Sequence, residues 1–102
     1  MQIERKSGTS KGNRRIWIEG SALADSGFTK GDKLFRLIDC EDGSLHLHRT
    51  ACEASTRRHS IAGTADRPIL DLTGKWVTAF MGDHPRFTAT ITADSITITP
   101  CG

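Results

Sequence analysis

The sequence predicts an all-β protein with one or two short helical turns, and two observations carry this prediction. Residues 86–99, RFTATITADSITIT, place apolar side chains at alternate positions, with threonine at most of the others. Such alternation is typical of strands that bury one face, and β-branched residues favour strands. The same order of apolar residues and glycines also occurs twice along the chain, so both copies are expected to fold alike. With 102 residues, the chain has the length of one domain.

The first copy begins at residue 15 with RIWIEGSALADSGFTKGD, and the second begins at residue 69 with ILDLTGKWVTAFMGD. In each copy a short strand has two apolar residues on one face. A glycine ends the strand, and one or two helical turns and a Gly-Asp turn follow. The second copy is three residues shorter between its two glycines. The matched positions are Ile16 and Leu70, Ile18 and Leu72, Gly20 and Gly74, Leu23 and Val77, Phe28 and Phe80, and Gly31-Asp32 and Gly82-Asp83.

A strand and a returning strand are expected after the Gly-Asp turn of each copy. From there the copies are related by an offset of 51 residues, so that residues 44–47 fall on residues 95–98. The first copy is less regular, because Arg36 falls where the second copy has Phe87. The sequence therefore leaves open which face of residues 34–38 is buried.

This duplication divides the chain into four parts. Residues 1–12 are polar and basic and are expected to form an N-terminal arm, partly ordered at most. The two repeats are assigned to residues 13–49 and 68–100, and together they predict one compact domain over residues 13–100. Residues 50–67, which are polar, small and basic, are expected to be a linker with at most a short strand or turn.

The stretch CEDGSLHLHRTAC, residues 40–52, carries ligand-type residues that suggest a zinc site. The offset of 51 places Cys40 on Ile91, which predicts a buried core thiol. By the same offset His46 and His48 fall on threonines of the opposite face, so one tetrahedral zinc could not easily take Cys40 and both histidines. We therefore expect no metal and no cofactor. The alternative that survives combines His46 and His48 with one linker residue, Cys52 or His59. Asp42-Gly43 is expected to form the turn between the strands.

Composition excludes several classes of protein. The net charge is only +2, but residues 1–18 hold five basic residues against one acid, a local sum of +4. Residues 49–67 hold four arginines against two acids, a local sum of +2. Clusters of this kind attract phosphate backbones. No apolar run approaches a membrane span, and the N-terminal residues lack the apolar core of a secretory signal, so a cytoplasmic protein with free thiols is expected.

These motifs resemble the swapped-hairpin AbrB superfamily, and within it the SymE-like proteins. The first copy carries the resemblance in residues 16–20 (IWIEG), 26–28 (SGF) and 31–34 (GDKL), and the second in residues 70–77 (LDLTGKWV) and 79–80 (AF). The resemblance implies a small barrel of two interleaved hairpin units. In the family the units come from two chains, whereas this chain carries both and could close a pseudo-dimer alone. A homodimer is the alternative. The first copy departs from the pattern by having Ser21-Ala22 where the second has Lys75-Trp76.

The resemblance implies a small DNA-binding transcriptional regulator that is not an enzyme and grips phosphates with basic residues. The basic residues expected to contact nucleic acid are Lys11, Arg14, Arg15, Arg57, Arg58, Arg67 and Lys75. One alternative is an inhibitor or interaction module of a phage or mobile element, whose candidate interface residues are Trp17, His46 and His48. Strand parity places Trp17 on the side away from Ile16 and Ile18. The other alternative is a SymE-like toxin of a toxin–antitoxin system acting on RNA, which would need general acid–base groups. Its candidates are His46, His48, His59 and His84, with Arg57 and Arg58.

Overall fold

The computed structural model describes residues 1–50 and 57–102. Within these residues the chain forms ten strands and two short helices in two antiparallel sheets, which confirms the all-β class. In chain order the elements are β1 (Gln2–Lys6), β2 (Gly8–Ser10), β3 (Asn13–Glu19), α1 (Ser21–Ala24), β4 (Lys33–Asp39), β5 (Ser44–His48), β6 (Arg57–Ser60), β7 (Ala62–Gly63), β8 (Pro68–Thr73), α2 (Lys75–Met81), β9 (Arg86–Ile91) and β10 (Ser95–Cys101).

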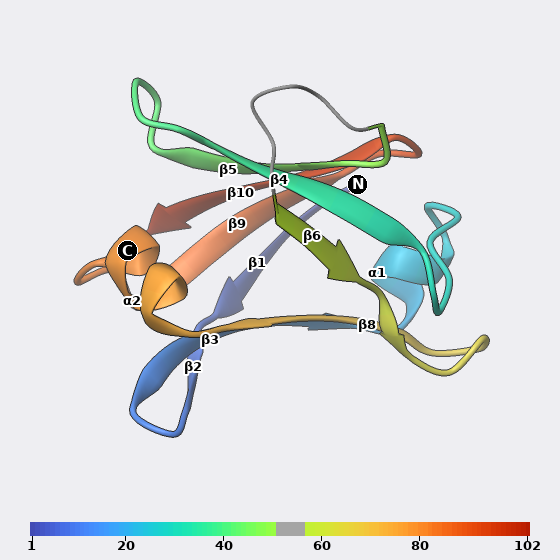
Figure 1. The fold of residues 1–102 in the computed structure, drawn as a ribbon, viewed down its shortest axis with the longest axis horizontal. Helices are drawn as coiled ribbons and strands as arrows, with labels where there is room; N and C mark the ends of the chain where they lie inside the picture. The colour runs from blue at the N-terminus through green and yellow to red at the C-terminus, as the bar shows by residue number, and fades with distance from the viewer. Residues whose placement is uncertain (51–56) are drawn as a thin grey trace.

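The two sheets enclose one hydrophobic core. The larger sheet has the strand order β1-β9-β10-β5-β4-β6 and the smaller one the order β2-β3-β8-β7. Figure 1 shows the sheets as two layers, with α1 and α2 at opposite ends of the space between them. Both sheets contribute to the core, because Ile16 and Leu72 of the smaller sheet and Leu45 and Ile98 of the larger are almost fully buried.

The β9–β10 hairpin has the predicted alternation. Phe87, Ala89 and Ile91 of β9 are at most 1% exposed, whereas the intervening threonines lie on the outer face. Ile96 pairs with Ile91 in the register and is fully buried as well. A threonine-rich outer face costs little, because hydroxyl groups remain in contact with water.

The β4–β5 hairpin resolves the face that the sequence left open. Leu34 is fully buried, and Arg36 and Ile38 share its parity along the strand. The prediction that Cys40 is a core thiol is wrong, because Cys40 is exposed. The physical reason is the register: Asp39 pairs with Ser44 as the last rung of β4–β5, so Cys40 lies beyond the strand, in the turn. Asp42-Gly43 contributes to this turn as expected, and Gly43 has a φ of 71°.

The N-terminal residues and the linker are more regular than predicted. Residues 2–6 form β1, which pairs with β9 along its whole length, and residues 8–10 form β2, which pairs with β3. The interpretation of residues 1–12 as a loose arm is therefore wrong. In the linker, β6 pairs with β4 and β7 pairs with β8, and Ile61 between them is 2% exposed. Backbone pairing in sheets does not require apolar alternation at an edge, which is why these strands gave no sequence signal.

Both predicted helical segments are present, and each follows a glycine that ends a strand. Gly20 and Gly74 have φ values of 81° and 129°, a conformation that glycine adopts without a steric penalty. The helix of the shorter second copy is the longer one, with seven residues in α2 against four in α1. The three extra residues of the first copy therefore lie in the turns after α1. No helix in residues 1–50 and 57–102 is long and apolar enough to cross a membrane.

Candidate nucleic-acid interface

A cleft of about 520 Å³ lies where β1 passes into β2 and faces the outward side of β3. Its lining contains three cations, one carboxylate and one tryptophan. We refer to it as the cationic cleft, lined by Arg5, Lys6, Gly8, Thr9, Arg15, Trp17 and Glu19. Strand parity puts Arg15, Trp17 and Glu19 on the same side of β3, because successive side chains of a strand alternate. Ile16 and Ile18, on the other side, are buried in the core.

Trp17 is the aromatic wall of the cationic cleft. It is 36% exposed, which agrees with the prediction that it faces away from Ile16 and Ile18. The guanidinium carbon of Arg15 lies 4.2 Å from the centroid of the Trp17 ring, a cation–π stack. A partly exposed ring beside cations is a surface on which a nucleobase or an apolar side chain can pack.

Arg15 is held in place by Asp71 of β8. The register pairs Trp17 with Asp71, and the carboxylate accepts two hydrogen bonds of 2.8 Å from Nε and Nη2 of Arg15. The hydrogen bond to Asp71 raises the pKa of Arg15, against a smaller lowering by desolvation. Arg15 was predicted to contact phosphate, and Asp71 now partly neutralises it. Its planar group therefore serves mainly to fix the Trp17 ring.

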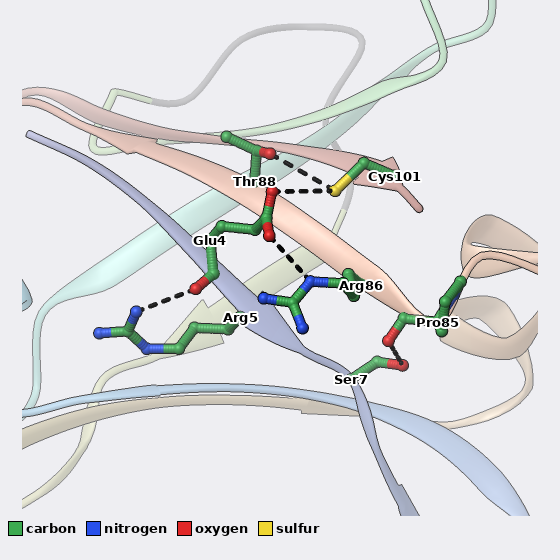
Figure 2. Close-up of polar contacts among 7 residues, drawn as sticks. All are labelled: Glu4, Arg5, Ser7, Pro85, Arg86, Thr88 and Cys101. Atoms are coloured by element: carbon green, nitrogen blue, oxygen red, sulfur yellow. Dashed lines mark hydrogen bonds and ion pairs between the residues drawn. The ribbon is translucent and has the colours of Figure 1, made fainter.

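Arg5 and Lys6 supply the charge that is not neutralised. Arg5 donates a hydrogen bond of 3.0 Å to the backbone oxygen of Glu4, but the Glu4 carboxylate accepts from Arg86 at 2.8 Å. Figure 2 shows this carboxylate turned toward Arg86 and Cys101, with the Arg5 guanidinium on the other side of the strand. Within the described part of the chain, Lys6 forms no ion pair. Neither residue was among the predicted phosphate contacts, although both belong to the basic N-terminal run.

Arg14 does not line the cationic cleft, and its contact with nucleic acid stays a prediction. Its side chain donates to the backbone oxygens of Gly82, at 3.0 Å, and His84, and to the Ser7 hydroxyl. The last carbonyls of a helix lack partners within that helix. Arg14 satisfies this need at the end of α2, so its guanidinium connects β3 to the segment after α2.

The other predicted cations are dispersed. Lys11 lies in the β2–β3 turn, Arg67 precedes β8 and Lys75 begins α2, and all three are exposed. None of them lines the cationic cleft. Arg57 and Arg58 are neighbours on β6, where the register pairs Arg57 with Arg36 and Arg58 with Phe35, on opposite faces of the sheet.

A second basic group lies where β4 and β6 approach α2, and the sequence did not indicate it. The guanidinium carbon of Arg36 lies 3.8 Å from the Trp76 ring centroid, and the His59 ring lies 5.4 Å from it. Burial, and to a lesser degree the positive charges of Arg36 and Arg57, lower the pKa of His59. In the sequence, the only signal for this group was the spacing of Arg57 and His59, which are two residues apart and therefore lie on one face of a strand.

His46 and His48 lie on the outer face of the larger sheet, as predicted. Their rings stack with centroids 5.9 Å apart. Leu45, which precedes them, and Leu47, which lies between them in sequence, are fully buried. The Nε2 atom of His46 lies 2.9 Å from the Ser44 hydroxyl, and its Nδ1 lies 3.3 Å from that of Thr97.

A zinc site built on this histidine pair has little support. His59 packs against Trp76, and it pairs with Leu34, whose parity is that of the core. Cys52, the other linker ligand considered, lies outside the described residues. A different set, Asp39, Asp42 and His46, offers ligand atoms within 4.8 Å of one another. The Asp42 carboxylate already accepts hydrogen bonds from the backbone and hydroxyl of Ser44, which lower its pKa.

Comparison with protein-family models, with curated proteins and with solved structures found no match to this chain. The interpretation of the cationic cleft therefore rests on its own residues. Sequence reasoning found Arg15 and Trp17 but missed Arg5 and Lys6, which it had placed in an arm. The signal for them was the run of charged residues Glu4, Arg5 and Lys6, because charged side chains are typical of an edge strand protected against aggregation.

Proposed function

We propose that this protein binds DNA through the cationic cleft, as a small transcriptional regulator of the AbrB-like type. The observation that carries the proposal is that Arg5 and Lys6, whose charges are not neutralised, line the same cleft as the exposed Trp17. Phosphates supply the negative charge that such cations attract, and a base has a face that can stack on Trp17. Glu19 at the same cleft repels phosphate, so the backbone is expected to follow the side lined by Arg5 and Lys6.

The strand registers support the finer proposal that two tandem repeats form a swapped-hairpin barrel as a pseudo-dimer. In the repeats, Ile16 is equivalent to Leu70 and Ile18 to Leu72. In the β3–β8 pair, Ile16 pairs with Leu72 and Ile18 pairs with Leu70, so exchanging the two repeats leaves the pairing unchanged. In the β5–β10 pair, the rung His46–Thr97 joins equivalent positions of the two repeats in the same way. Self-complementary pairing of this kind is what a two-fold axis between two like units requires.

One difference between the two hairpins accounts for the irregular first copy. The rung Ile38–Leu45 is followed by one more rung in β4–β5, whereas Ile91–Ile96 is the last rung of β9–β10. The proposed equivalence for β4 is therefore an offset of 53 residues, not 51. Under this offset Leu34, and not Arg36, takes the position of Phe87, which agrees with the burial of both residues.

The test measures binding of random-sequence DNA, duplex and single-stranded, by fluorescence anisotropy at several salt concentrations. The variant R5A/K6A is compared with K30A/K33A, which removes the same charge from exposed positions outside the cleft. Wild-type protein is expected to bind and to weaken steeply with salt. If Arg5 and Lys6 each contact one phosphate, R5A/K6A reduces the slope of log K against log salt by about 1.8 on duplex DNA, since each phosphate contributes about 0.9.

Two results would count against this proposal. Equal losses in R5A/K6A and K30A/K33A would mean that only net charge matters and that the cleft is not the site. A lack of binding by the wild-type protein at low salt would remove DNA as the ligand. The exposed Trp17 would then favour the protein-binding alternative, because tryptophan and arginine are frequent anchors of protein interfaces.

The RNA-cleaving alternative has weaker geometric support. Within residues 1–50 and 57–102, none of the four histidines forms an ion pair with a carboxylate. The stacked pair His46 and His48 lies on the larger sheet, whereas the cationic cleft lies against β3. An assay of RNA cleavage with H46A/H48A as the comparison would detect this activity directly.

A further inference from the structure

The basic group beside α2 forms a compact cluster around one indole ring. We call it the Trp76 cluster, and it comprises Arg36, Arg57, His59 and Trp76. The register pairs Arg36 with Arg57 and Leu34 with His59. All of these residues therefore share one face at the edge of the larger sheet, since directly paired residues and residues two apart point to the same side. Trp76 approaches this face from α2 and contacts both Arg36 and His59.

Two positively charged residues of the Trp76 cluster lie directly opposite one another. Arg36 and Arg57 are cross-strand neighbours, and like charges directly opposite one another destabilise a sheet. Burial and the Arg57 charge lower the pKa of Arg36. Among the described residues, the three ion pairs join Arg15 to Asp71, Arg49 to Asp32 and Arg86 to Glu4, and none of them includes Arg57.

His59 adds a polar atom that lacks a hydrogen bond. Its Nε2 is buried and has no hydrogen-bond partner, the sole side-chain atom of this kind in the part of the chain that the structure describes. Buried polar atoms are nearly always satisfied, and at an exception a water molecule, an ion or a ligand can complete the bonding. Stacking against Trp76 accounts for the position of the Arg36 side chain. It does not explain why, among the described residues, Arg57 has no ion pair and His59 Nε2 has no hydrogen bond.

We propose that the Trp76 cluster is a phosphate-binding site that takes the terminal phosphate of a phosphomonoester. A guanidinium group matches two phosphate oxygens at once, and two such groups lie side by side here. A phosphomonoester carries close to two negative charges at neutral pH, more than the single charge of an internal phosphodiester, and so compensates several cations at one place. The site is separate from the cationic cleft and does not depend on the function proposed for it.

Phosphate is expected to bind more tightly as His59 becomes protonated. The groups that act on His59 are Arg36 on β4 and Arg57 on β6, which repel its proton, and the uncharged Trp76 on α2. A bound dianion offsets this repulsion. The His59 pKa is therefore expected to rise when phosphate binds, which NMR titration of the imidazole protons can follow.

The test uses tryptophan fluorescence, because the chain has only two tryptophans. In the variant W17F, Trp76 is the single indole, and its emission reports on the cluster alone. Inorganic phosphate is titrated at constant ionic strength against chloride. We expect a saturable change in emission whose midpoint is raised about threefold to tenfold by R57A, as for the loss of an exposed charge-assisted hydrogen bond. The matched control is R58A, the adjacent arginine on the opposite face of β6, which should leave the midpoint unchanged.

A second variant and a second ligand pair complete the test. H59Q should keep the fluorescence response and remove the part of its pH dependence that comes from His59, because the titration of phosphate itself is the same for both proteins. Oligothymidylate with a 5′-phosphate is compared with the same oligomer ending in a 5′-hydroxyl. Tighter binding of the 5′-phosphorylated oligomer than of the 5′-hydroxyl oligomer identifies a nucleic-acid terminus as the source. Saturable binding of inorganic phosphate without a difference between the two oligomers identifies a small phosphorylated molecule. The proposal is overturned if phosphate causes no saturable change or if R58A weakens phosphate binding as much as R57A.

Discussion

Arg14 and Arg15 are neighbours in sequence and of the same type, but the structure predicts different consequences for their removal. Arg14→Ala deletes the donors to the Gly82 and His84 backbone oxygens and to the Ser7 hydroxyl. Hydrogen bonds from a charged donor contribute about 1.5–3 kcal/mol when buried. These acceptors are at the surface and can be rehydrated, so we expect the low end of that range in total, about 1.5–2 kcal/mol.

Arg15→Ala deletes the ion pair with Asp71. Both partners of that pair are about one-third exposed, and solvent screening leaves such a pair with little net stabilisation. The difference between the variants should therefore be close to 1 kcal/mol. For a domain of this size it corresponds to about 4–8 °C in Tm.

Urea and thermal unfolding followed by circular dichroism measure both variants, with Arg14→Lys as a further control. Lysine keeps the charge but cannot reach three acceptors with a planar fork, so it should recover only part of the loss. If Arg14→Ala and Arg15→Ala unfold within 0.3 kcal/mol of each other, the assignment of Arg14 to the end of α2 is wrong, since about 1 kcal/mol was expected between them.

Three further predictions concern pH, backbone conformation and thiol exposure. Burial lowers the pKa of His59 below its ordinary value, so between the two pKa values the unfolded chain binds more protons than the folded chain. The free energy of unfolding should therefore fall as pH drops through about 6.5 and below. Urea unfolding of the wild-type protein and of His59→Phe at several pH values checks this. The same pH dependence in both proteins would contradict the prediction. Gly63→Ala should lower the free energy of unfolding by about 2 kcal/mol or more. The backbone has a φ of +85°, and the new Cβ would lie 2.2 Å from the Arg67 backbone oxygen. A loss below about 0.5 kcal/mol in urea unfolding would be inconsistent with that contact. In the folded protein, Cys40 should react with a thiol reagent faster than Cys101, which is less exposed. Each thiol is measured in a variant whose other cysteines are replaced by serine. Slow reaction of Cys40 would restore its assignment to the core.

The elements with a strong local pattern were predictable from the sequence. Residues 87–91 and 96–98 alternate on either side of a turn, and their apolar face is the face that is buried. Glycines that end a strand before a helical turn were also recognised, because few other residues adopt the positive φ that Gly20 and Gly74 have. Trp17 was expected to face outward from parity alone, and its exposure agrees.

The elements without such a pattern were missed or misplaced. Strands β1 and β6 are edge strands rich in charge, and they exist because β9 and β4 offer them unpaired backbone groups. Cys40 was placed in the core because an offset of 51 was carried across a hairpin that has one additional rung. An error of this size moves a residue out of a strand, and local composition does not reveal it.

The sequence by itself determined the β class, the two glycine-led helical turns and the faces of the most regular strands, because these depend on periodicity and on the conformational range of single residues. Only the tertiary structure decided which cations share a surface. It directed Arg14 to the carbonyls after α2, paired Arg15 with Asp71 and brought Arg5 and Lys6 to Trp17. It also assembled Arg36, Arg57 and His59 around Trp76. The physical reason is that a charged side chain on a strand is compatible with many neighbours, so its partner is fixed by the register and packing of segments that lie far apart along the chain.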